Sequence, residues 1–273
     1  MEKRVLLMVM MLWCLCASGQ SDSLFVEKVL REAPADAGEL YFARQFLGRP
    51  YVAHTLEVND TERLVVNTRQ LDCTTLVENA LALALCHRRG QTTFGDFKAC
   101  LTSLRYRGGV IDGYPSRLHY FSDWIDDNIS MRFVSDVLTS AQRFTDVQTV
   151  SVNYMSTHAG SYKALAAHPE MVPVIAAQEK RLTGQKRRYI PKKSITASDE
   201  MRAVIHDGDI IAITCSKPGL DIAHLGFAVW HADGLHLLNA SQLHKKVVED
   251  NINLYQYLQK HPTHTGIRVI RGK

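Results

Sequence analysis

The chain has 273 residues, 46% of them hydrophobic and 22% charged, which is enough for one large domain with a sizeable core. Its formal net charge is only +4, and its basic residues are scattered apart from the short run Lys186-Arg187-Arg188 and the pair Lys192-Lys193. This distribution argues against a nucleic-acid-binding protein, which needs a clustered basic face.

The first residues have the order that is typical of a secretory signal peptide. Glu2-Lys3-Arg4 precedes an apolar run over residues 5–15, and small residues follow at Ala17-Ser18-Gly19. The apolar run is too short to span a bilayer comfortably. The residues before Cys14 and Cys16 are large, whereas lipid attachment needs a small one. We therefore expect residues 1–19 to be removed and the mature protein to be exported and soluble rather than lipid-anchored.

The mature chain would keep Cys73, Cys86, Cys100 and Cys215. Four cysteines could form two disulfides in an oxidising compartment, but their wide spacing is not that of a disulfide scaffold. The sequence has no Cys-x-x-Cys and no His-Glu-x-x-His motif. We therefore expect no metal site and no cofactor.

The first predicted elements are helical. Residues 23–46 carry apolar side chains at the spacing of two short amphipathic helices, broken near Pro34. Gly48-Arg49-Pro50 predicts a turn, and residues 64–67 predict a short strand. Residues 71–86 are nearly unbroken good helix formers, so they predict a buried helix.

Cys73 lies at or just before the first turn of that buried helix. The helix dipole and free N–H groups at such a position favour the thiolate, which is the nucleophilic form of cysteine. Asp72 as the N-cap would make Cys73 the first helical residue, whereas a capping box from Thr75 to Glu78 would start the helix after it. A lone cysteine is more often a small core residue, so position alone does not make Cys73 catalytic.

The middle of the chain is mixed. Residues 94–104 predict a helix, and the glycine- and aromatic-rich residues 105–124 predict a loop that leads into a helix starting at Ser122 or Asp123. Such a loop either lines a site or is a pinned surface loop. Residues 147–152 predict a strand, residues 171–182 a helix, and Lys186-Arg187-Arg188 a solvated loop.

From Asp207 onward the pattern changes to strands, at residues 208–214, 224–230, 235–240 and 266–271. Helices followed by consecutive strands indicate an α+β fold rather than a doubly wound parallel sheet. We predict one catalytic domain over residues 20–273, with N-terminal helices and a mixed insertion around residues 95–200.

A cysteine nucleophile needs a nearby base and a third group that orients the base. His224 opens a strand after a turn, which would place its ring at a sheet end. The alternative is a histidine that is merely satisfied at a strand end. Among twelve histidines, composition alone does not choose the base.

Asn239 on the next strand is the candidate orienting residue. A two-residue turn at Asp233-Gly234 would pair Asn239 with Ala228, about 13 Å along the strand from His224. A wider loop over residues 230–233 would make Asn239 and His224 direct neighbours. Both registers put the two side chains on one face, and the sequence does not decide between them.

Several motifs, in this order, resemble the NlpC/P60 cysteine hydrolases of bacterial cell walls. Two further segments resemble the DUF1460 branch, which is N-acetylmuramoyl-L-alanine amidase-like. The superfamily motifs are Gly48-Arg49-Pro50-Tyr51-Val52, Leu71-Asp72-Cys73-Thr74-Thr75-Leu76-Val77-Glu78, Gly208-Asp209-Ile210-Ile211, Ala223-His224-Leu225-Gly226-Phe227-Ala228-Val229 and Leu238-Asn239-Ala240-Ser241. The branch segments are residues 114–124 and 218–224.

The resemblance implies a papain-like α+β fold, in which a central helix carries the nucleophile and packs on an antiparallel sheet, with helical additions. By motif position the nucleophile is Cys73, the general base and acid His224, and the orienting residue Asn239. Many relatives are expected to have histidine at the third place, so the role of Asn239 rests on the least support.

The resemblance and the chemistry together suggest four residues for binding. Tyr51 matches a tyrosine beside the nucleophile that can bind the developing oxyanion. Arg117, His119 and Tyr120 are candidates for substrate contacts, because a guanidinium suits a peptide carboxylate and an aromatic ring suits a sugar.

The implied activity is hydrolysis of the bond between N-acetylmuramic acid, including its anhydro form, and L-alanine. Muropeptides would be the partners, without nucleic acid or stable membrane insertion, in the bacterial periplasm. Two alternatives stay open: an endopeptidase that cuts between D-glutamate and a diamino acid, and a catalytically silent muropeptide-binding protein. A disulfide from Cys73 to Cys86 or Cys100 would also remove the nucleophile.

Overall fold

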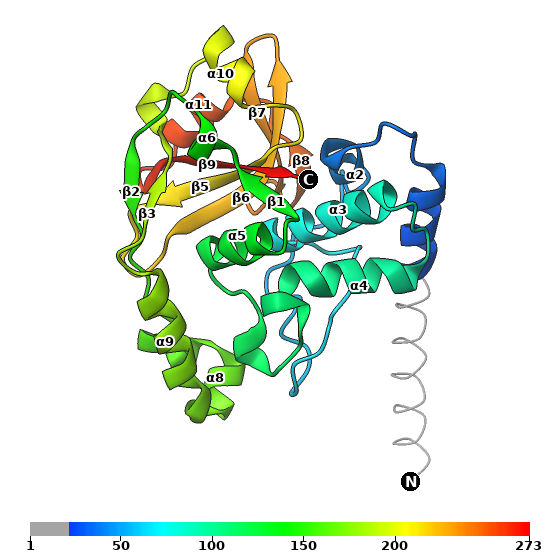
Figure 1. The fold of residues 1–273 in the computed structure, drawn as a ribbon, viewed down its shortest axis with the longest axis vertical. Coiled ribbons are helices and arrows are strands. Elements are labelled where there is room, and N and C mark those ends of the chain that lie inside the picture. Colours follow the sequence, from blue (N-terminus) through cyan, green and yellow to red (C-terminus); the bar gives the residue numbers. More distant parts are fainter. Residues whose placement is uncertain (1–21) are drawn as a thin grey trace.

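The computed structural model describes residues 22–273, and the predicted signal peptide lies outside that range. The chain combines an antiparallel sheet with helices, as the α+β prediction requires, and the first helices cover one face of the sheet (Figure 1). Residues 22–32 are helical, and they are followed by α2 (Glu39–Arg44), α3 (Cys73–Arg88), α4 (Phe94–Arg105) and α5 (Phe121–Ser130).

The main sheet has the strand order β1-β9-β5-β6-β7-β8, and β4 pairs with β9 beside this path. All its pairs are antiparallel. The strands are β1 (Val134–Asp136), β4 (Ile190–Pro191), β5 (Ile210–Cys215), β6 (Ile222–His231), β7 (Gly234–Ser241), β8 (Lys246–Glu249) and β9 (His264–Gly272). The four long strands were predicted from the sequence, whereas β1, β4 and β8 are too short for an alternating pattern to reveal them.

Short helices and a separate ribbon complete the chain. The helices are α6 (Val137–Ser140), α7 (Tyr154–Thr157), α8 (Lys163–Ala167), α9 (Val172–Leu182), α10 (Asp199–Val204) and α11 (Leu254–Gln259). The ribbon consists of β2 (Val147–Thr149) and β3 (Lys186–Arg188). Among residues 22–273, no helix has the length and apolar character needed to cross a membrane.

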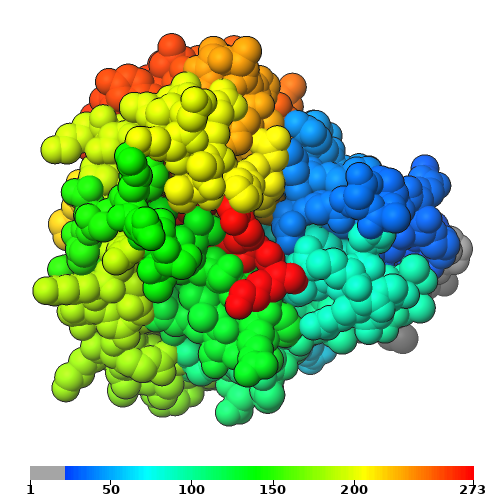
Figure 2. Space-filling view, turned by 45° about the horizontal axis from the view of Figure 1, so that its top comes forward, coloured from blue at the N-terminus to red at the C-terminus, as the bar shows by residue number. Residues whose placement is uncertain are grey.

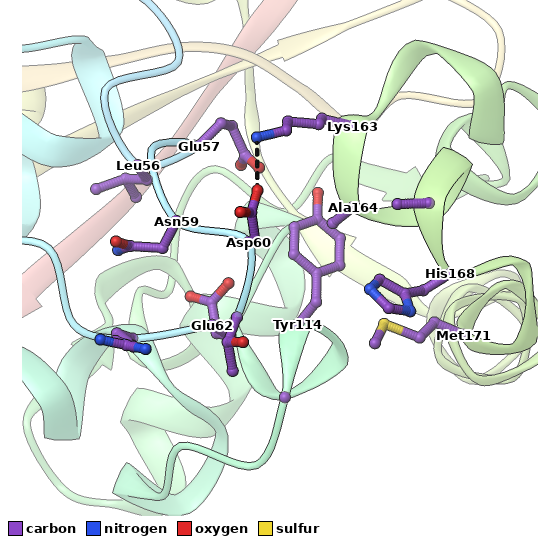
Figure 3. Close-up of a pocket in the computed structure, with 14 residues that line it drawn as sticks. Leu56, Glu57, Asn59, Asp60, Glu62, Tyr114, Lys163, Ala164, His168 and Met171 are labelled. Atoms are coloured by element: carbon purple, nitrogen blue, oxygen red, sulfur yellow. Dashed lines mark hydrogen bonds and ion pairs between the residues drawn. The ribbon is translucent and has the colours of Figure 1, made fainter. Parts of the chain in front are cut away.

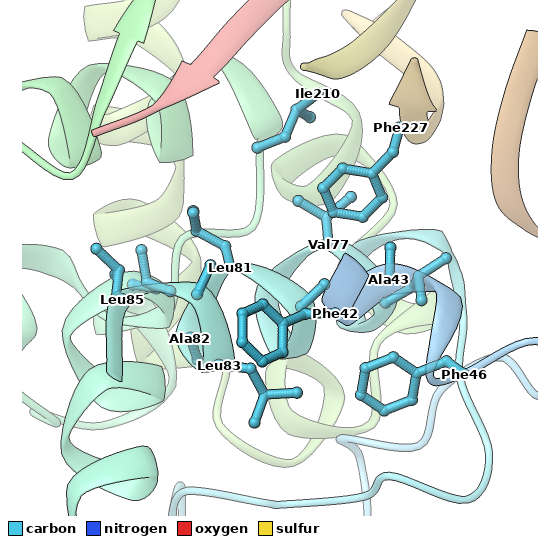
Figure 4. Packing of buried hydrophobic residues seen from close by; sticks show 14 of the residues in the cluster. Phe42, Ala43, Phe46, Val77, Leu81, Ala82, Leu83, Leu85, Ile210 and Phe227 are labelled. Carbon is cyan, nitrogen blue, oxygen red and sulfur yellow. The ribbon is translucent and has the colours of Figure 1, made fainter. Parts of the chain in front are cut away.

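Helix α3 lies at the centre of the larger core. Its residues from Thr75 to Cys86 are all buried, so this helix is enclosed on every side rather than amphipathic. Figure 4 shows Val77 and Leu81 of α3 packed with Ile210 and Phe227 of the sheet, beside Phe42 of α2. The first turn of α3 is therefore held against the sheet by the packing of the turns that follow it.

The sheet separates this core from two other apolar clusters. Strand β5 shows the division, because Ile210 and Ala212 face the α3 core, whereas Ile211 and Ile213 face a second cluster with α10 and α11. A third cluster gathers α7, α8 and α9 around Tyr114, Tyr120 and neighbouring apolar side chains. In Figure 1 these helices project from the sheet as a separate lobe.

Two predicted segments differ from the structure. Residues 64–67 form no strand, and the Val65 carbonyl oxygen instead accepts a hydrogen bond of 2.6 Å from the Arg105 guanidinium. Residues 186–188 are not a solvated loop but the strand β3. The two arginines are held by the protein: Arg187 pairs with Asp126, and Arg188 donates to the carbonyl oxygens of Leu138 and Ala141, which follow β1.

The final strand, β9, is an interior strand of the sheet, between β1 and β5. The last residue of its register, Gly272, pairs with Val134. Figure 2 shows these C-terminal residues reaching the surface between the helical part of the molecule and the segment around residue 200.

A buried ion pair should contribute strongly to stability. Glu78 of α3 accepts a 2.7 Å bond from Arg105 of α4, and each side chain is only 2% exposed. Glu78→Ala should lower the free energy of unfolding by about 3–5 kcal/mol, because Arg105 keeps a buried charge without its partner. Urea unfolding measures this loss. Asp60→Ala, at the exposed pair with Lys163, is the control and should leave stability unchanged. Equal losses in both variants would contradict the prediction.

Candidate active site

Cys73 is the first residue of α3. The Asp72 carboxylate accepts a 2.8 Å bond from the Thr75 backbone N–H, and the Thr75 hydroxyl accepts a 2.9 Å bond from the Asp72 N–H. This reciprocal box makes Asp72 the N-cap. Of the two helix starts that the sequence allowed, the structure has the one that places Cys73 at the dipole's positive end.

The thiol at this position is nevertheless a weak acid. Burial raises the pKa of Cys73 to about 12, and the neighbouring Asp72 carboxylate adds to the effect. Hydrogen bonds from Leu225 and Thr74 to the sulfur oppose this shift without cancelling it. Desolvation thus opposes the thiolate that the position at the helix N-terminus was predicted to favour. A resting thiol of this kind needs a base to remove its proton.

His224 and Asn239 meet across the hairpin of β6 and β7. The hairpin turns at Ala232-Asp233, one residue earlier than the Asp233-Gly234 signal suggested. Extending its register places Asn239 opposite Gly226, two residues from His224 and on the same face. This register lies between the two that the sequence allowed. The His224 Nε2 and Asn239 Oδ1 atoms are 2.9 Å apart.

Asp250 fixes the orientation of Asn239. The Asn239 Nδ2 atom donates to the Asp250 carboxylate at 2.5 Å and to the Leu237 carbonyl oxygen at 3.3 Å. The Asn239 Oδ1 atom therefore faces His224 and accepts the Nε2–H proton. Asp250 was not predicted from the sequence, because it lies in an ordinary-looking polar turn after β8. Its only sequence signal is an acidic residue close to Asn239 along the chain.

The hydrogen bond at Nε2 leaves Nδ1 as the ring nitrogen of His224 with a lone pair. Burial lowers the pKa of His224, whereas the Asn239 hydrogen bond and the Asp250 charge act in the opposite direction. The net direction favours a neutral imidazole at neutral pH. A neutral imidazole with Nδ1 unprotonated is a base that can accept the proton of a thiol.

Cys73 and His224 line the same cavity, of about 180 Å³. Two of the predicted contact residues, His119 and Tyr120, also line it, but Tyr51 and Arg117 do not. Among the described residues around this cavity there is no lysine or arginine. The other walls are mostly apolar or aromatic: Phe121, Met155, Tyr162, Leu220, Ile222, Ala223 and Leu225.

Tyr51 lies beside the start of α3. Its backbone forms a parallel bridge with Leu71, two residues before Cys73. Burial raises the pKa of the Tyr51 phenol, and negative charge at Cys73 and Asp72 acts in the same direction. The hydroxyl therefore stays protonated and can donate a hydrogen bond. Its use for an oxyanion stays a prediction.

Arg117 is not a free cation. Its buried guanidinium pairs with Glu57 and lies 3.7 Å from Glu62, and it stacks over Tyr114 at 4.9 Å. It lines a neighbouring cavity of about 150 Å³ that shares Thr74 with the Cys73 cavity. Because its charge is already balanced by two carboxylates, direct binding of a substrate carboxylate by Arg117 is less favourable than the sequence suggested.

The other two predicted contact residues are also held by the protein. The Tyr120 hydroxyl donates to Glu179 at 2.7 Å and accepts from the Met155 N–H at 3.0 Å, so it joins the α7–α9 lobe to the site. His119 Nε2 lies 2.9 Å from the Tyr114 carbonyl oxygen. Burial and the Arg117 charge lower the pKa of His119 to about 3, which makes it a neutral wall residue. Their contact with a substrate stays a prediction.

A larger cavity of about 310 Å³ lies between the α8 lobe and residues 56–63. Figure 3 shows Tyr114 in its middle, with Glu57 and Glu62 on one side and the Lys163–Asp60 ion pair above. Glu57 also lines the Arg117 cavity. Carboxylates and cations both line this larger cavity, and Lys163 is paired with Asp60.

One cluster among residues 22–273 has a spacing that could hold a metal ion, namely His231, Asp233 and His236 at the β6–β7 hairpin. His231 Nε2 lies 2.6 Å from Glu249, and His236 Nε2 lies 2.9 Å from Asp233. The hairpin end is seven residues along β6 from His224, roughly 23 Å. The cluster therefore belongs to the far end of the sheet and not to the Cys73 cavity.

The cysteine arrangement excludes the disulfide that would remove the nucleophile. Cys73, Cys86, Cys100 and Cys215 are all free. Cys86 lies thirteen residues after Cys73 on the same helix, about 20 Å along its axis, which is too far for a bond. Cys86 instead contacts Cys100, and a hydrogen bond between their thiols raises the pKa of Cys86.

The comparison with known families now bears on this site. The model of the AmiA-like family, described as N-acetylmuramoyl-L-alanine amidase-like, matches residues 41–267. The chain belongs to this family. The match includes the Cys73, His224 and Asn239 segments, and it confirms the resemblance to the amidase-like branch.

Solved structures agree with the family. An N-acetylmuramoyl-L-alanine amidase from Bacteroides uniformis is 42% identical, with a TM-score of 0.80, over 86% of this chain and 97% of that one. A protein from Bacteroides fragilis that is provisionally named a xylanase is 44% identical, with a TM-score of 0.79, over 85% of this chain and 99% of that one.

A more distant structure shares the fold alone. A Legionella pneumophila protein of the DUF1460 family model is 21% identical, with a TM-score of 0.72, over 94% of this chain and 96% of that one. None of the curated proteins matches this chain.

The hydrogen bonds of Asn239 predict a pH effect. Asn239→Ala should lower kcat/KM for a cleaved substrate by about 10- to 100-fold, because the imidazole loses its orienting acceptor. It should also move the acid limb of the kcat/KM profile to lower pH. Removing a group that raises the His224 pKa lowers that pKa further, so the neutral base persists in more acid solution. Steady-state rates across pH 4 to 8 measure both effects.

Asp250→Ala should shift the profile in the same direction, because the Asp250 charge also raises the pKa of His224. Loss of the carboxylate also frees the Asn239 amide to rotate. A variant with wild-type kcat and an unmoved acid limb would show that Asp250 does not position Asn239.

Proposed function

We propose that this protein is a cysteine amidase that hydrolyses the bond between N-acetylmuramic acid, including its anhydro form, and the L-alanine of muropeptides. Membership in the amidase-like family supports the reaction class. The observation that carries the proposal is the hydrogen-bonded series Asp250, Asn239 and His224, which ends in the cavity that holds Cys73.

In the proposed mechanism, His224 Nδ1 removes the proton from Cys73, and the sulfur attacks the lactyl carbonyl carbon. The neutral resting pair makes this general-base step necessary, since burial disfavours a free thiolate. The oxyanion of the tetrahedral intermediate can accept hydrogen bonds from Tyr51 and from a backbone N–H near Cys73. The imidazolium then protonates the departing amine, and water hydrolyses the thioester.

The charge of the Cys73 cavity supports the amidase over the endopeptidase. In the amidase reaction the acyl half is the lactyl group and its uncharged sugar. In the endopeptidase reaction, the acyl half is D-glutamate, whose free α-carboxylate would lie close to the reacting carbonyl. The described residues around this cavity include no lysine or arginine, and the nearby Asp72 would repel such a carboxylate.

The same cavity gives little support to glycoside hydrolysis, although one relative is provisionally named a xylanase. Glycoside hydrolases usually use two carboxyl groups on opposite sides of the bond. Among the residues that the structure describes, Asp221 is the one acidic side chain that lines the Cys73 cavity. Its carboxylate already accepts a 3.0 Å bond from the Ser122 backbone N–H near the start of α5.

The proposed place of action follows from the substrate and the sequence. Muropeptides are present where the cell wall is built and degraded. We expect residues 1–19 to direct export to the bacterial periplasm and then to be removed, which leaves a soluble enzyme.

Products from defined muropeptides test the proposal. The wild-type protein should release peptides with a free L-alanine N-terminus, detected by mass spectrometry. Cys73→Ala should release at least 1,000-fold less product, because it removes the nucleophile. Circular dichroism and thermal melting of both proteins control for folding.

Other outcomes identify the alternatives. A free diamino-acid N-terminus in the products would establish the endopeptidase reaction instead. Equal absence of products from the wild type and Cys73→Ala, with muropeptide binding retained by both, would identify a binding protein.

A further inference from the structure

His224 lines a second cavity, of about 510 Å³, that does not include Cys73. Its wall combines the segment after β5, the start of β6, the β7–β8 turn, α11 and the start of β9. His224 therefore lies between two spaces, one of which contains the proposed nucleophile and one of which does not.

The charged side chains that line the second cavity are basic. Lys217 and Lys245 line it, and it includes no aspartate or glutamate among the described residues. Both lysines are exposed, and in the part of the chain that the structure describes neither has a carboxylate within ion-pair distance. The Cys73 cavity has the opposite composition, with one aspartate and no lysine or arginine.

His264 is a buried part of the wall of the second cavity. It is only 8% exposed, and its Nδ1 atom has no hydrogen-bond partner. A buried polar atom without a partner is unfavourable unless a ligand or water satisfies it. Burial, the neighbouring histidines His261 and His224, and the Lys217 charge lower the pKa of His264 to about 4, so its ring is neutral.

The chemistry of acyl transfer indicates which half of the substrate occupies each cavity. The sulfur–carbon bond forms as the carbon–nitrogen bond breaks, so the acyl half of the substrate stays on the Cys73 side. The leaving nitrogen takes its proton from His224, so the leaving half lies on the histidine side. The water that later cleaves the thioester returns a proton to His224. In the amidase reaction the leaving half is the stem peptide, which carries free carboxylates.

We propose that the Lys217–Lys245 cavity is the leaving-group subsite and binds carboxylates of the stem peptide. This inference rests on the proposed function and adds the position of each half of the substrate. Lys217 and Lys245 supply the charge, and the buried His264 ring forms part of the wall. The uncharged muramoyl half lies in the Cys73 cavity, between Phe121 and Tyr162. Arg117, which is already paired, is not needed for the carboxylates.

The kinetic test compares two substrates that differ only in charge. One is N-acetylmuramoyl-L-alanyl-D-glutamate, and the other carries carboxamides in place of both glutamate carboxylates. The double variant Lys217→Gln with Lys245→Gln should lose about tenfold in kcat/KM on the charged substrate, and less than about twofold on the amidated one. Lys246→Gln is the matched control, since Lys246 adjoins Lys245 but does not line the cavity. Thermal melting verifies that each variant is folded.

A binding measurement separates this inference from the proposed function. Calorimetry follows binding of the product tripeptide L-alanyl-γ-D-glutamyl-diaminopimelate to Cys73→Ala, with and without the two lysine substitutions. Weaker binding without the two lysines supports the subsite, whether or not the wild type cleaves a substrate. If the wild type cleaves neither muramoyl substrate, that separate result overturns only the proposed amidase function. Equal tripeptide binding and equal charge preference in the two-lysine variant and the control would overturn the subsite, whatever is cleaved.

Discussion

The hydrogen bond between His224 Nε2 and Asn239 Oδ1 is the constraint on which the chemistry of this site depends. It decides which ring nitrogen holds the proton and leaves Nδ1 as the base. The Asn239 amide turns its oxygen and not its nitrogen to His224, because its nitrogen donates to the Asp250 carboxylate. A neutral amide can thus replace the third histidine expected in many relatives, since a buried carboxylate behind it fixes its orientation.

The rigid part of the site is the start of α3. An enclosed helix cannot rotate or slide without losing contacts on all sides, so the core fixes the position of α3. The capping box at Asp72 and Thr75 in turn fixes Cys73 at the start of this helix. Tyr120, which lines the same cavity as Cys73, is instead held by buried polar bonds to Glu179 and to the Met155 backbone. Cys73 is thus placed by apolar packing, whereas Tyr120 is placed by hydrogen bonds.

The sequence predicted the elements and motif residues better than it predicted their partners. Capping residues and helix formers located α3, and β-branched runs located β5, β6 and β9. The hairpin register could not be predicted from the sequence. The turn lies at Ala232-Asp233, whereas Asp233-Gly234 is the stronger local turn signal. Asp250 and the ion pairs of Arg117 depend on contacts between distant segments, which no local pattern encodes.

The interior position of β9 also governs how the molecule can be assembled. Strands β1, β4 and β5 all pair with this last strand, so the sheet cannot close until the C-terminal residues are available. A chain still being synthesised would have to keep the edges of β5 and β1 uncovered, which favours late, cooperative folding over folding from the N-terminus.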